Sequence, residues 1–273
     1  MRDAAPPQKE TMAERKAVFF DIDNTLWDFH NHIPDSAKEA VRALRRNGHL
    51  ALLCSGRARG FIRDPELLGL GFDGIVSGCG TLLEFEGQTL FYHRVPRDVA
   101  LRSVETARRF GFRAILEGRE YLYMELSEFA GDSYGDKLRR DLGDRLLGIE
   151  EHWGNWEFSK FSCDTRGCDQ AAGLAAMAED FDAIVHNANV VELVPKGFDK
   201  GGGVRRFCEM QGIALSDTVA FGDSVNDLEM FAACGVSVCM GNGVEKAKHA
   251  ADLVTTALDE NGVWNGCKTL GLI

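Results

Sequence analysis

Two pairs of acidic residues follow apolar runs that are typical of buried strands. Asp21 and Asp23 end the run KAVFFDID, and Asp223 and Asp227 follow the run TVAFG. In an extended chain residues i and i+2 point to the same side, so the carboxylates of Asp21 and Asp23 project together. Ligands of open α/β sheets bind beyond the carboxyl ends of the strands. Carboxylate oxygens gathered there suit Mg²⁺, which takes one or two of them together with water and phosphate oxygens.

Two further segments contain candidates for contacts to a phosphate group. Ser55 ends an apolar run in LLCSGR, where its hydroxyl and the backbone N–H groups beside it, at Gly56, could bind a phosphoryl oxygen. Lys200 precedes a predicted helix in PKGFDKGGG, where its ammonium could neutralise a nucleophile and a transferring group together. Lys196 is the weaker alternative to Lys200.

The elements that must position these residues alternate between strand and helix. Continuous apolar runs predict buried parallel strands at 16–23, 49–56 and 72–78, and amphipathic or capped segments predict helices at 34–48 and 59–69. A β-α-β-α-β series of this kind predicts a doubly wound parallel sheet in the α/β class.

The pattern changes near residue 81 and returns near residue 196. A hairpin around Glu86-Gly87 is followed by predicted helices at 97–110, 133–147 and 168–180 and by short strands at 112–125, near 156–163 and at 182–195. From residue 200 the first pattern resumes, with helices at 200–212, 225–234 and 244–250 and strands at 218–223 and 236–241. We therefore expect one α/β domain over residues 1–80 and 196–273 and an inserted α+β domain over residues 81–195.

Composition excludes several classes of protein. The net charge of −11 argues against a nucleic-acid surface, which needs a clustered basic footprint. No apolar run approaches the roughly 20 residues that cross a bilayer. Residues 1–14 are polar, without the apolar segment of a secretory signal, and are expected to form a loose tail. None of the eight cysteines has C-x-x-C spacing, so we expect free thiols in the reducing environment of the cytoplasm.

The motifs DIDNT, CSGR, a lysine before a helix and GDSVND, in this order, resemble those of the haloacid-dehalogenase-like (HAD) phosphatase superfamily. The resemblance covers the whole chain, because the insert lies where this superfamily has its C2 cap. The segments VPKGFDKGGGVRRF and VAFGDSVNDLEMFAACGVSVCMGNGVEKAKHAADLVT are similar to the Cof-like, type IIB branch. The resemblance implies a Rossmann-like core with an inserted cap.

The resemblance also implies a role for each motif residue. Asp21 would be the nucleophile that attacks phosphorus, and Asp23 would protonate the leaving oxygen and then activate water. Nearby carboxylates and partial burial are expected to raise the pKa of Asp23 for this task. Ser55, Gly56, Lys200 and Asn226 would bind the phosphoryl group, and Asp21, the carbonyl of Asp23, Asp223 and Asp227 would form or support the Mg²⁺ site. The implied substrate is a small phosphorylated metabolite.

Three features depart from the family pattern. Asn24 stands where many relatives have glycine, and Ser55 stands where threonine is common. The segment SGCGTLL replaces an Asn-Asn-Gly-like turn and places Cys79 near the junction of core and cap. A catalytic role for this thiol is not favoured. Trp27 either lines the entrance or packs in the core.

Three functions are compatible with these motifs. The first is hydrolysis of small phosphomonoesters, with sugar phosphates favoured. A phosphohexomutase would need a cap that binds a second phosphate, for which Arg94, Arg97, Arg113 and Arg119 are the candidates. The third is a phosphate-binding regulatory module without turnover, which the presence of Asp23, Lys200 and Asp223 disfavours.

Overall fold

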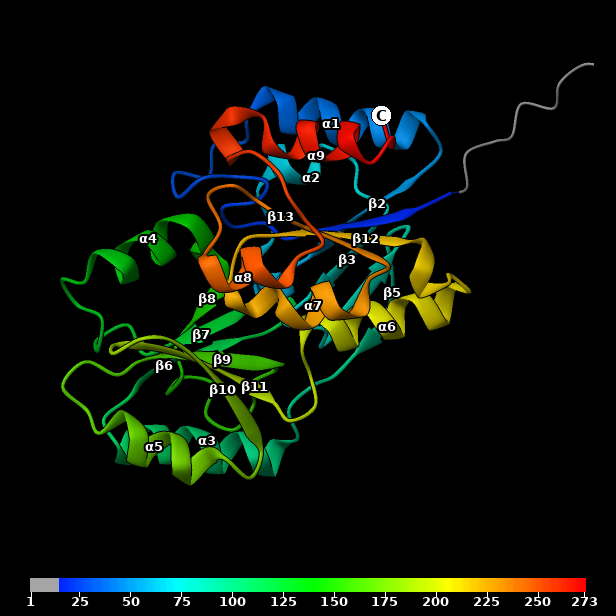
Figure 1. The fold of residues 1–273 in the computed structure, drawn as a ribbon. Coiled ribbons are helices and arrows are strands. Elements are labelled where there is room, and N and C mark those ends of the chain that lie inside the picture. Colours follow the sequence, from blue (N-terminus) through cyan, green and yellow to red (C-terminus); the bar gives the residue numbers. More distant parts are fainter. Residues whose placement is uncertain (1–14) are drawn as a thin grey trace, which may run out of the picture.

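The computed structural model describes residues 15–273, so the predicted tail over residues 1–14 lies outside the described part of the chain. Its larger sheet has eight strands (Figure 1). Their order is β14 (Leu253–Val254), β13 (Val236–Cys239), β12 (Thr218–Gly222), β1 (Ala17–Phe20), β2 (Leu50–Cys54), β3 (Gly74–Ser77), β4 (Leu82–Phe85) and β5 (Gln88–Tyr92). The strands from β14 to β3 are parallel, and β4 and β5 are antiparallel.

Helices cover both faces of this sheet (Figure 1). One face packs against α1 (Asp35–Arg46), α2 (Pro65–Leu68) and α9 (Gly262–Thr269), and the other packs against α6 (Lys200–Gln211), α7 (Leu228–Ala233) and α8 (Glu245–Ala250). Strand β1 shows the reason: Val18 and Phe20 lie in the apolar cluster of the first face, and Ala17 and Phe19 lie in that of the second. A strand that is buried on both faces reads as a continuous apolar run. The predicted doubly wound parallel sheet is confirmed.

A second sheet of six strands forms the rest of the molecule. Its order is β10 (Phe181–Asn187), β11 (Val190–Pro195), β9 (Lys160–Asp164), β6 (Arg113–Glu117), β7 (Leu122–Met124) and β8 (Leu146–Leu147). Helices α3 (Arg97–Arg109) and α5 (Gln170–Met177) pack against one face, which is apolar. Helix α4 (Ser133–Leu142) packs near β6 and β7. We call this part the cap and the part with the larger sheet the core.

The hairpin that was expected to open the inserted domain joins the core sheet instead. The hairpin around Glu86-Gly87 forms as predicted, but β4 pairs with β3 and so extends the core sheet. A hairpin pattern predicts two paired strands without indicating which sheet they join. We therefore propose that the inserted domain begins after Tyr92 rather than at residue 81.

Local contacts shorten the helices predicted at 59–69 and at 133–147. The helix predicted at 59–69 is replaced by a 3-10 turn at Arg59–Phe61 and by α2, because Gly60 donates its N–H to the carbonyl of Gly118 in the cap, at 3.0 Å, and Asp64 caps α2. The helix predicted at 133–147 ends at Leu142, since Gly143 has a φ of 51°. The remaining 3-10 turns are Gly143–Arg145, Leu215–Asp217, Val225–Asp227 and Leu258–Glu260.

No helix within residues 15–273 is both long enough and apolar enough to span a membrane.

Candidate active site

Three strand ends and one helix start meet at a single edge of the core sheet. Asp21 follows β1, Ser55 follows β2 and Asp223 follows β12. Strand β1 pairs in parallel with both β2 and β12, so the three carboxyl ends are neighbours. Lys200 is the first residue of α6. The four segments that contain the sequence motifs are therefore adjacent in space.

Lys200 connects two of the buried carboxylates. Its Nζ donates to Oδ1 of Asp21 and to Oδ1 of Asp227, each at 2.6 Å, and to Oδ1 of Asn226 at 3.1 Å. The lysine is 1% exposed, and burial by itself would lower its pKa, but the charges of Asp21 and Asp227 outweigh burial and raise the pKa well above its ordinary value. The lysine therefore stays cationic, and its charge opposes the burial that raises the pKa of Asp21 well above its ordinary value. Lys196 is exposed, so it is not the lysine of this site.

Replacement of Lys200 by methionine is expected to damage activity and stability together. The variant would leave the carboxylates of Asp21 and Asp227 buried without their cation, which typically costs about 3–5 kcal/mol of stability. Loss of one charge-stabilising group should lower kcat/KM by about 10²- to 10³-fold. Thermal unfolding and steady-state kinetics would measure both effects, with Lys196→Met as the matched control. Wild-type kcat/KM in Lys200→Met would contradict the assignment.

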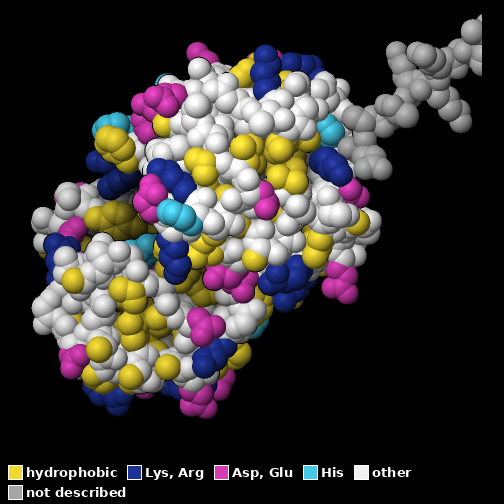
Figure 2. Space-filling view, in the orientation of Figure 1, with side chains coloured by type: hydrophobic (Ala, Val, Ile, Leu, Met, Phe, Trp, Pro, Cys, Tyr) yellow, Lys and Arg dark blue, Asp and Glu magenta, His cyan; other side chains and the backbone are white. Residues whose placement is uncertain are grey.

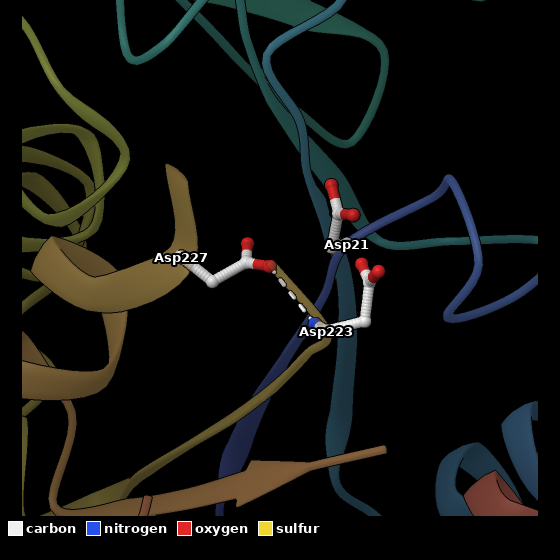
Figure 3. A group of neighbouring side chains, drawn as sticks. All are labelled: Asp21, Asp223 and Asp227. Carbon is white, nitrogen blue, oxygen red and sulfur yellow. Dashed lines mark hydrogen bonds between the residues drawn. The ribbon is translucent and has the colours of Figure 1, made fainter. Parts of the chain in front are cut away.

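Asp223 and Asp227 form an acidic cluster with Asp21. One carboxylate oxygen from each lies within 4.8 Å of the others (Figure 3). Oδ2 of Asp227 accepts the backbone N–H groups of Asp223 and Ser224, at 2.9 and 3.0 Å, so this side chain fixes the loop and holds Lys200. In Figure 3 the carboxylates of Asp21 and Asp223 lie beside one another, and that of Asp227 reaches the backbone of Asp223.

The cluster suits a divalent cation. Burial and the charge of Asp227 raise the pKa of Asp223 to about 7, because the ionised form is disfavoured away from water and beside another carboxylate. Both oxygens of Asp227 are occupied by donors, whereas Asp21 and Asp223 retain acceptor capacity. Two carboxylates with room for water and phosphate oxygens match the ordinary Mg²⁺ ligand set. The residues present therefore fit Mg²⁺, with Asp227 in a supporting position.

Asp23 is bound by a guanidinium. Nε and Nη2 of Arg57 donate to Oδ2 and Oδ1 of Asp23, each at 2.7 Å, and Nε1 of Trp27 donates to Oδ1 at 3.1 Å. Burial would raise the pKa of Asp23, but the hydrogen bonds and charge of Arg57 outweigh burial and lower it. The expected increase in the pKa of Asp23 is therefore wrong for this arrangement. Arg57 belongs to the motif CSGR, but nothing in the sequence indicates its contact with Asp23.

Trp27 has both of the roles that were left open. The ring is 2% exposed and belongs to the apolar cluster of the core, and it also lines the cleft described below. The guanidinium of Arg57 lies 5.2 Å from the centroid of the ring. Trp27 and Asp23 thus hold Arg57 at the mouth of the site through a cation–π contact and an ion pair.

Ser55 and Gly56 form a buried loop beside the nucleophile candidate. Ser55 is 1% exposed, and its Oγ accepts the N–H of Arg57 at 3.1 Å. A Cβ on Gly56 would lie 3.5 Å from Nδ2 of Asn226, so the amide of Asn226 faces this loop. Oδ1 of Asn226 is bonded to Lys200, which leaves Nδ2 free to donate. These groups are hydrogen-bond donors suited to phosphoryl oxygens.

Cys79 stabilises this loop through a backbone hydrogen bond. Its backbone N–H donates to the carbonyl of Ser55 at 3.2 Å, and its φ of 55° belongs to the left-handed region. Burial raises the pKa of the Cys79 thiol to about 12, so the thiol is protonated at neutral pH and is a poor nucleophile. Cys79 therefore has a structural place in the turn.

A cleft of about 1010 Å³ opens between core and cap, and Figure 2 shows the molecule hollowed at this junction. Asp21, Asp23, Ser55, Asp223 and Asn226 line its core side. The cap side is lined both by polar residues, such as Lys160 and Glu192, and by apolar residues, such as Ile115, Phe129 and Leu138.

The four arginines considered for a second phosphate do not line this cleft. Arg113 is paired with Asp132 and Asp164, and Arg97 donates to the carbonyl of Gly154.

Comparison with known proteins gives consistent results. Residues 18–266 match the family model described as haloacid dehalogenase-like hydrolase. "Putative phosphatase YkrA" of Bacillus subtilis is 29% identical, over 95% of this chain and 99% of its own length. The "5-amino-6-(5-phospho-D-ribitylamino)uracil phosphatase YitU" of the same organism is 36% identical, over 90% of this chain and 94% of its own length.

Among solved structures, the HAD subclass IIB sugar phosphatase BT4131 superposes with a TM-score of 0.79 over 94% of this chain and 100% of its own. The two sequences are 24% identical, so this likeness concerns the fold, including the arrangement of core and cap.

Proposed function

The chain belongs to the haloacid dehalogenase-like hydrolases, and from this premise we propose that it is a Mg²⁺-dependent phosphatase that hydrolyses small phosphomonoesters through a phospho-aspartyl intermediate on Asp21. The observation that carries the proposal is the buried ion pair of Asp21 and Lys200, which opens on the cleft with Asp23 two residues further along the chain. We also propose that the enzyme is cytoplasmic, in agreement with its free cysteines.

The first half of the reaction transfers the phosphoryl group to Asp21. An oxygen of Asp21 forms a bond to phosphorus while the bond from phosphorus to the ester oxygen breaks, and Asp23 gives its proton to that oxygen. Ser55, Gly56 and Asn226 are placed to donate hydrogen bonds to the phosphoryl oxygens. Phosphoryl transfer depends chiefly on such positioning and on charge neutralisation.

The second half returns the enzyme to its starting state. Asp23 removes a proton from water as the water oxygen bonds to phosphorus, and the bond to Asp21 breaks to release inorganic phosphate. Lys200 balances the negative charge on Asp21 throughout. Bound at Asp21, the carbonyl of Asp23 and Asp223, Mg²⁺ would reduce repulsion between the nucleophile and the phosphate.

The pair of Asp23 and Arg57 has to open in this mechanism. Asp23 can donate a proton only after Arg57 releases at least one of its oxygens, because the bidentate pair occupies both. A phosphate dianion in the cleft offers the guanidinium a competing partner of higher charge. Substrate binding would thereby free Asp23 for protonation.

Sugar phosphates are the proposed substrates. The cap side of the cleft carries polar groups such as Lys160, Glu192 and His186 beside apolar ones, and the substrate named for YitU has a phosphorylated ribityl chain. The mutase alternative loses support because the four arginines considered for a second phosphate lie outside the cleft. A non-catalytic role does not explain why the ion pair of Asp21 and Lys200 is buried beside the cleft.

Removal of divalent cations tests the proposal. Hydrolysis of p-nitrophenyl phosphate is expected to fall by at least about 10²-fold in EDTA, because the carboxylates of Asp21 and Asp223 would then repel the phosphate. Addition of excess Mg²⁺ should restore the rate. Equal rates with EDTA and with Mg²⁺ would contradict metal dependence, and no hydrolysis of this substrate or of a sugar-phosphate panel would contradict phosphatase activity.

A further inference from the structure

We propose that Lys160, Glu192 and His186 form a subsite that binds the hydroxyl groups of an uncharged polyol leaving group. The inference rests on the proposed phosphatase function and specifies its substrate class. The three residues lie on β9, β11 and β10 of the cap sheet, and all of them line the cleft. They are not part of the phosphoryl-transfer machinery described above.

The subsite is a continuous chain of polar contacts. Nζ of Lys160 lies 2.5 Å from Oε2 of Glu192 and 3.3 Å from a carboxylate oxygen of Glu117, and Nε2 of His186 lies 2.8 Å from Oε1 of Glu192. Lys160 is 1% exposed, whereas 36% of the His186 side chain is exposed. This series of contacts therefore runs from the buried Lys160 to the partly exposed His186.

Strand pairing explains why these side chains face the cleft. Glu117 is opposite Lys160 and Glu192 is opposite Ser162 in antiparallel ladders. Side chains alternate along a strand, so the neighbours Leu116 and Phe161 turn to the apolar face that packs against α3 and α5. The polar residues then share the opposite face, which looks towards the core.

A contact with the core sets the subsite beside the phosphoryl group. Nζ of Lys160 donates to the carbonyl of Gly56 at 3.0 Å. Gly56 and Ser55 form the loop that we propose binds the phosphoryl group. A Cβ on Gly56 would lie 3.8 Å from Oε2 of Glu192. A leaving group attached to a phosphate in this loop would thus extend along Glu192 towards His186.

The charges around this path favour a neutral leaving group with many donors. Burial would raise the pKa of Glu192, but Lys160 and His186 outweigh burial and lower it to about 2, so this carboxylate is an ionised acceptor. The ionised carboxylate of Glu192 already balances Lys160 at 2.5 Å, so the lysine carries no surplus charge for an anion. Hydroxyl groups can donate to Glu192 and to Nδ1 of His186, whose Nε2–H is bonded to Glu192, whereas a second phosphate or a carboxylate would be repelled by Glu192.

The other cations on the cap side of the cleft are mostly neutralised as well. Arg166 is paired with Asp132 and Asp164. Lys137 on α4 has no carboxylate partner within residues 15–273. One lysine on a helix surface is a weak site for a second anion, so the subsite is still expected to prefer a neutral leaving group.

The first test compares substrates of the wild-type enzyme. Ribitol 5-phosphate represents a neutral polyol, fructose 1,6-bisphosphate carries a second phosphate, and 6-phosphogluconate carries a carboxylate. We expect kcat/KM to be at least about tenfold higher for ribitol 5-phosphate than for either anionic substrate, as expected for a difference of one charged hydrogen bond. Equal values, or a preference for an anionic leaving group, would overturn the proposal.

The second test removes the subsite. Glu192→Gln and His186→Ala are each expected to lower the ratio of kcat/KM for ribitol 5-phosphate to that for p-nitrophenyl phosphate by about tenfold or more, chiefly through KM. His186→Ala changes a partly exposed side chain, so it should fold even where Glu192→Gln is unstable. Glu105→Gln on the exposed side of α3 is the matched control and should keep the wild-type ratio. An unchanged ratio in both variants would overturn the proposal.

A binding measurement separates this inference from the proposed function. Calorimetric titration of Asp21→Asn protein with ribitol 5-phosphate, with and without Glu192→Gln, requires no turnover. Affinity that falls about tenfold with Glu192→Gln supports the subsite even if the wild-type enzyme hydrolyses nothing. Unchanged affinity, in an enzyme that still hydrolyses p-nitrophenyl phosphate, would contradict the subsite alone.

Discussion

Asp21→Asn is expected to lower kcat/KM for p-nitrophenyl phosphate by at least about 10⁴-fold, the scale seen when a covalent nucleophile is removed. The carboxamide has almost the shape of the carboxylate but neither its charge nor its nucleophilicity. Asp21 is 4% exposed and bonded to Lys200 at 2.6 Å, so water has little room to substitute for it. Steady-state kinetics with freshly purified protein would measure the loss.

Asp35→Asn is the matched control for this prediction. Its side chain is 98% exposed at the start of α1, so the same chemical change should leave kcat/KM within about twofold of wild type, as is usual for surface substitutions. Thermal unfolding of both variants would show whether either change disturbs the fold. Substantial activity in folded Asp21→Asn would exclude Asp21 as the nucleophile.

Asp23→Asn is expected to change the kinetics according to the leaving group. A sugar alcohol needs a proton as it leaves, so kcat/KM for a sugar phosphate should fall by about 10²- to 10⁴-fold. p-Nitrophenolate leaves without a proton, so phosphorylation of Asp21 by p-nitrophenyl phosphate should be affected less. Hydrolysis of the intermediate still needs Asp23 as a base, so a burst of about one equivalent of p-nitrophenolate should precede a slow steady state.

Rapid mixing would detect this burst. The asparagine retains an oxygen for Arg57 and Trp27, which limits structural disturbance. Equal losses for both substrates, without a burst, would show that Asp23 is not the acid and base of the reaction.

The sequence predicted the core sheet well, and it predicted that the motif residues meet at one edge of that sheet, because both features depend on local patterns. Strands buried on two faces, such as β1, are continuous apolar runs, and parallel strands bring their carboxyl ends to one edge whatever the details of packing. The proximity of Asp21, Ser55, Lys200 and Asp223 follows from this topology.

Features that depend on contacts between distant segments were missed. The pair of Asp23 and Arg57 joins loops after β1 and β2, and no spacing in the chain indicates that the two side chains meet. The hairpin of β4 and β5 was recognised but placed in the cap, because its partner strand cannot be read from its own residues. Strand β14 and helix α9 follow the last predicted helix and were not predicted at all.

The most direct test of the central claim is to trap the phosphorylated enzyme. Asp23→Asn protein would be mixed with p-nitrophenyl phosphate, quenched in acid, reduced with borohydride and digested for mass spectrometry. Borohydride reduces an aspartyl phosphate to homoserine, so we predict homoserine in place of Asp21 in the peptide that contains KAVFFDIDNT. Modification of another residue, or an unmodified peptide during steady turnover, would contradict a covalent mechanism on Asp21.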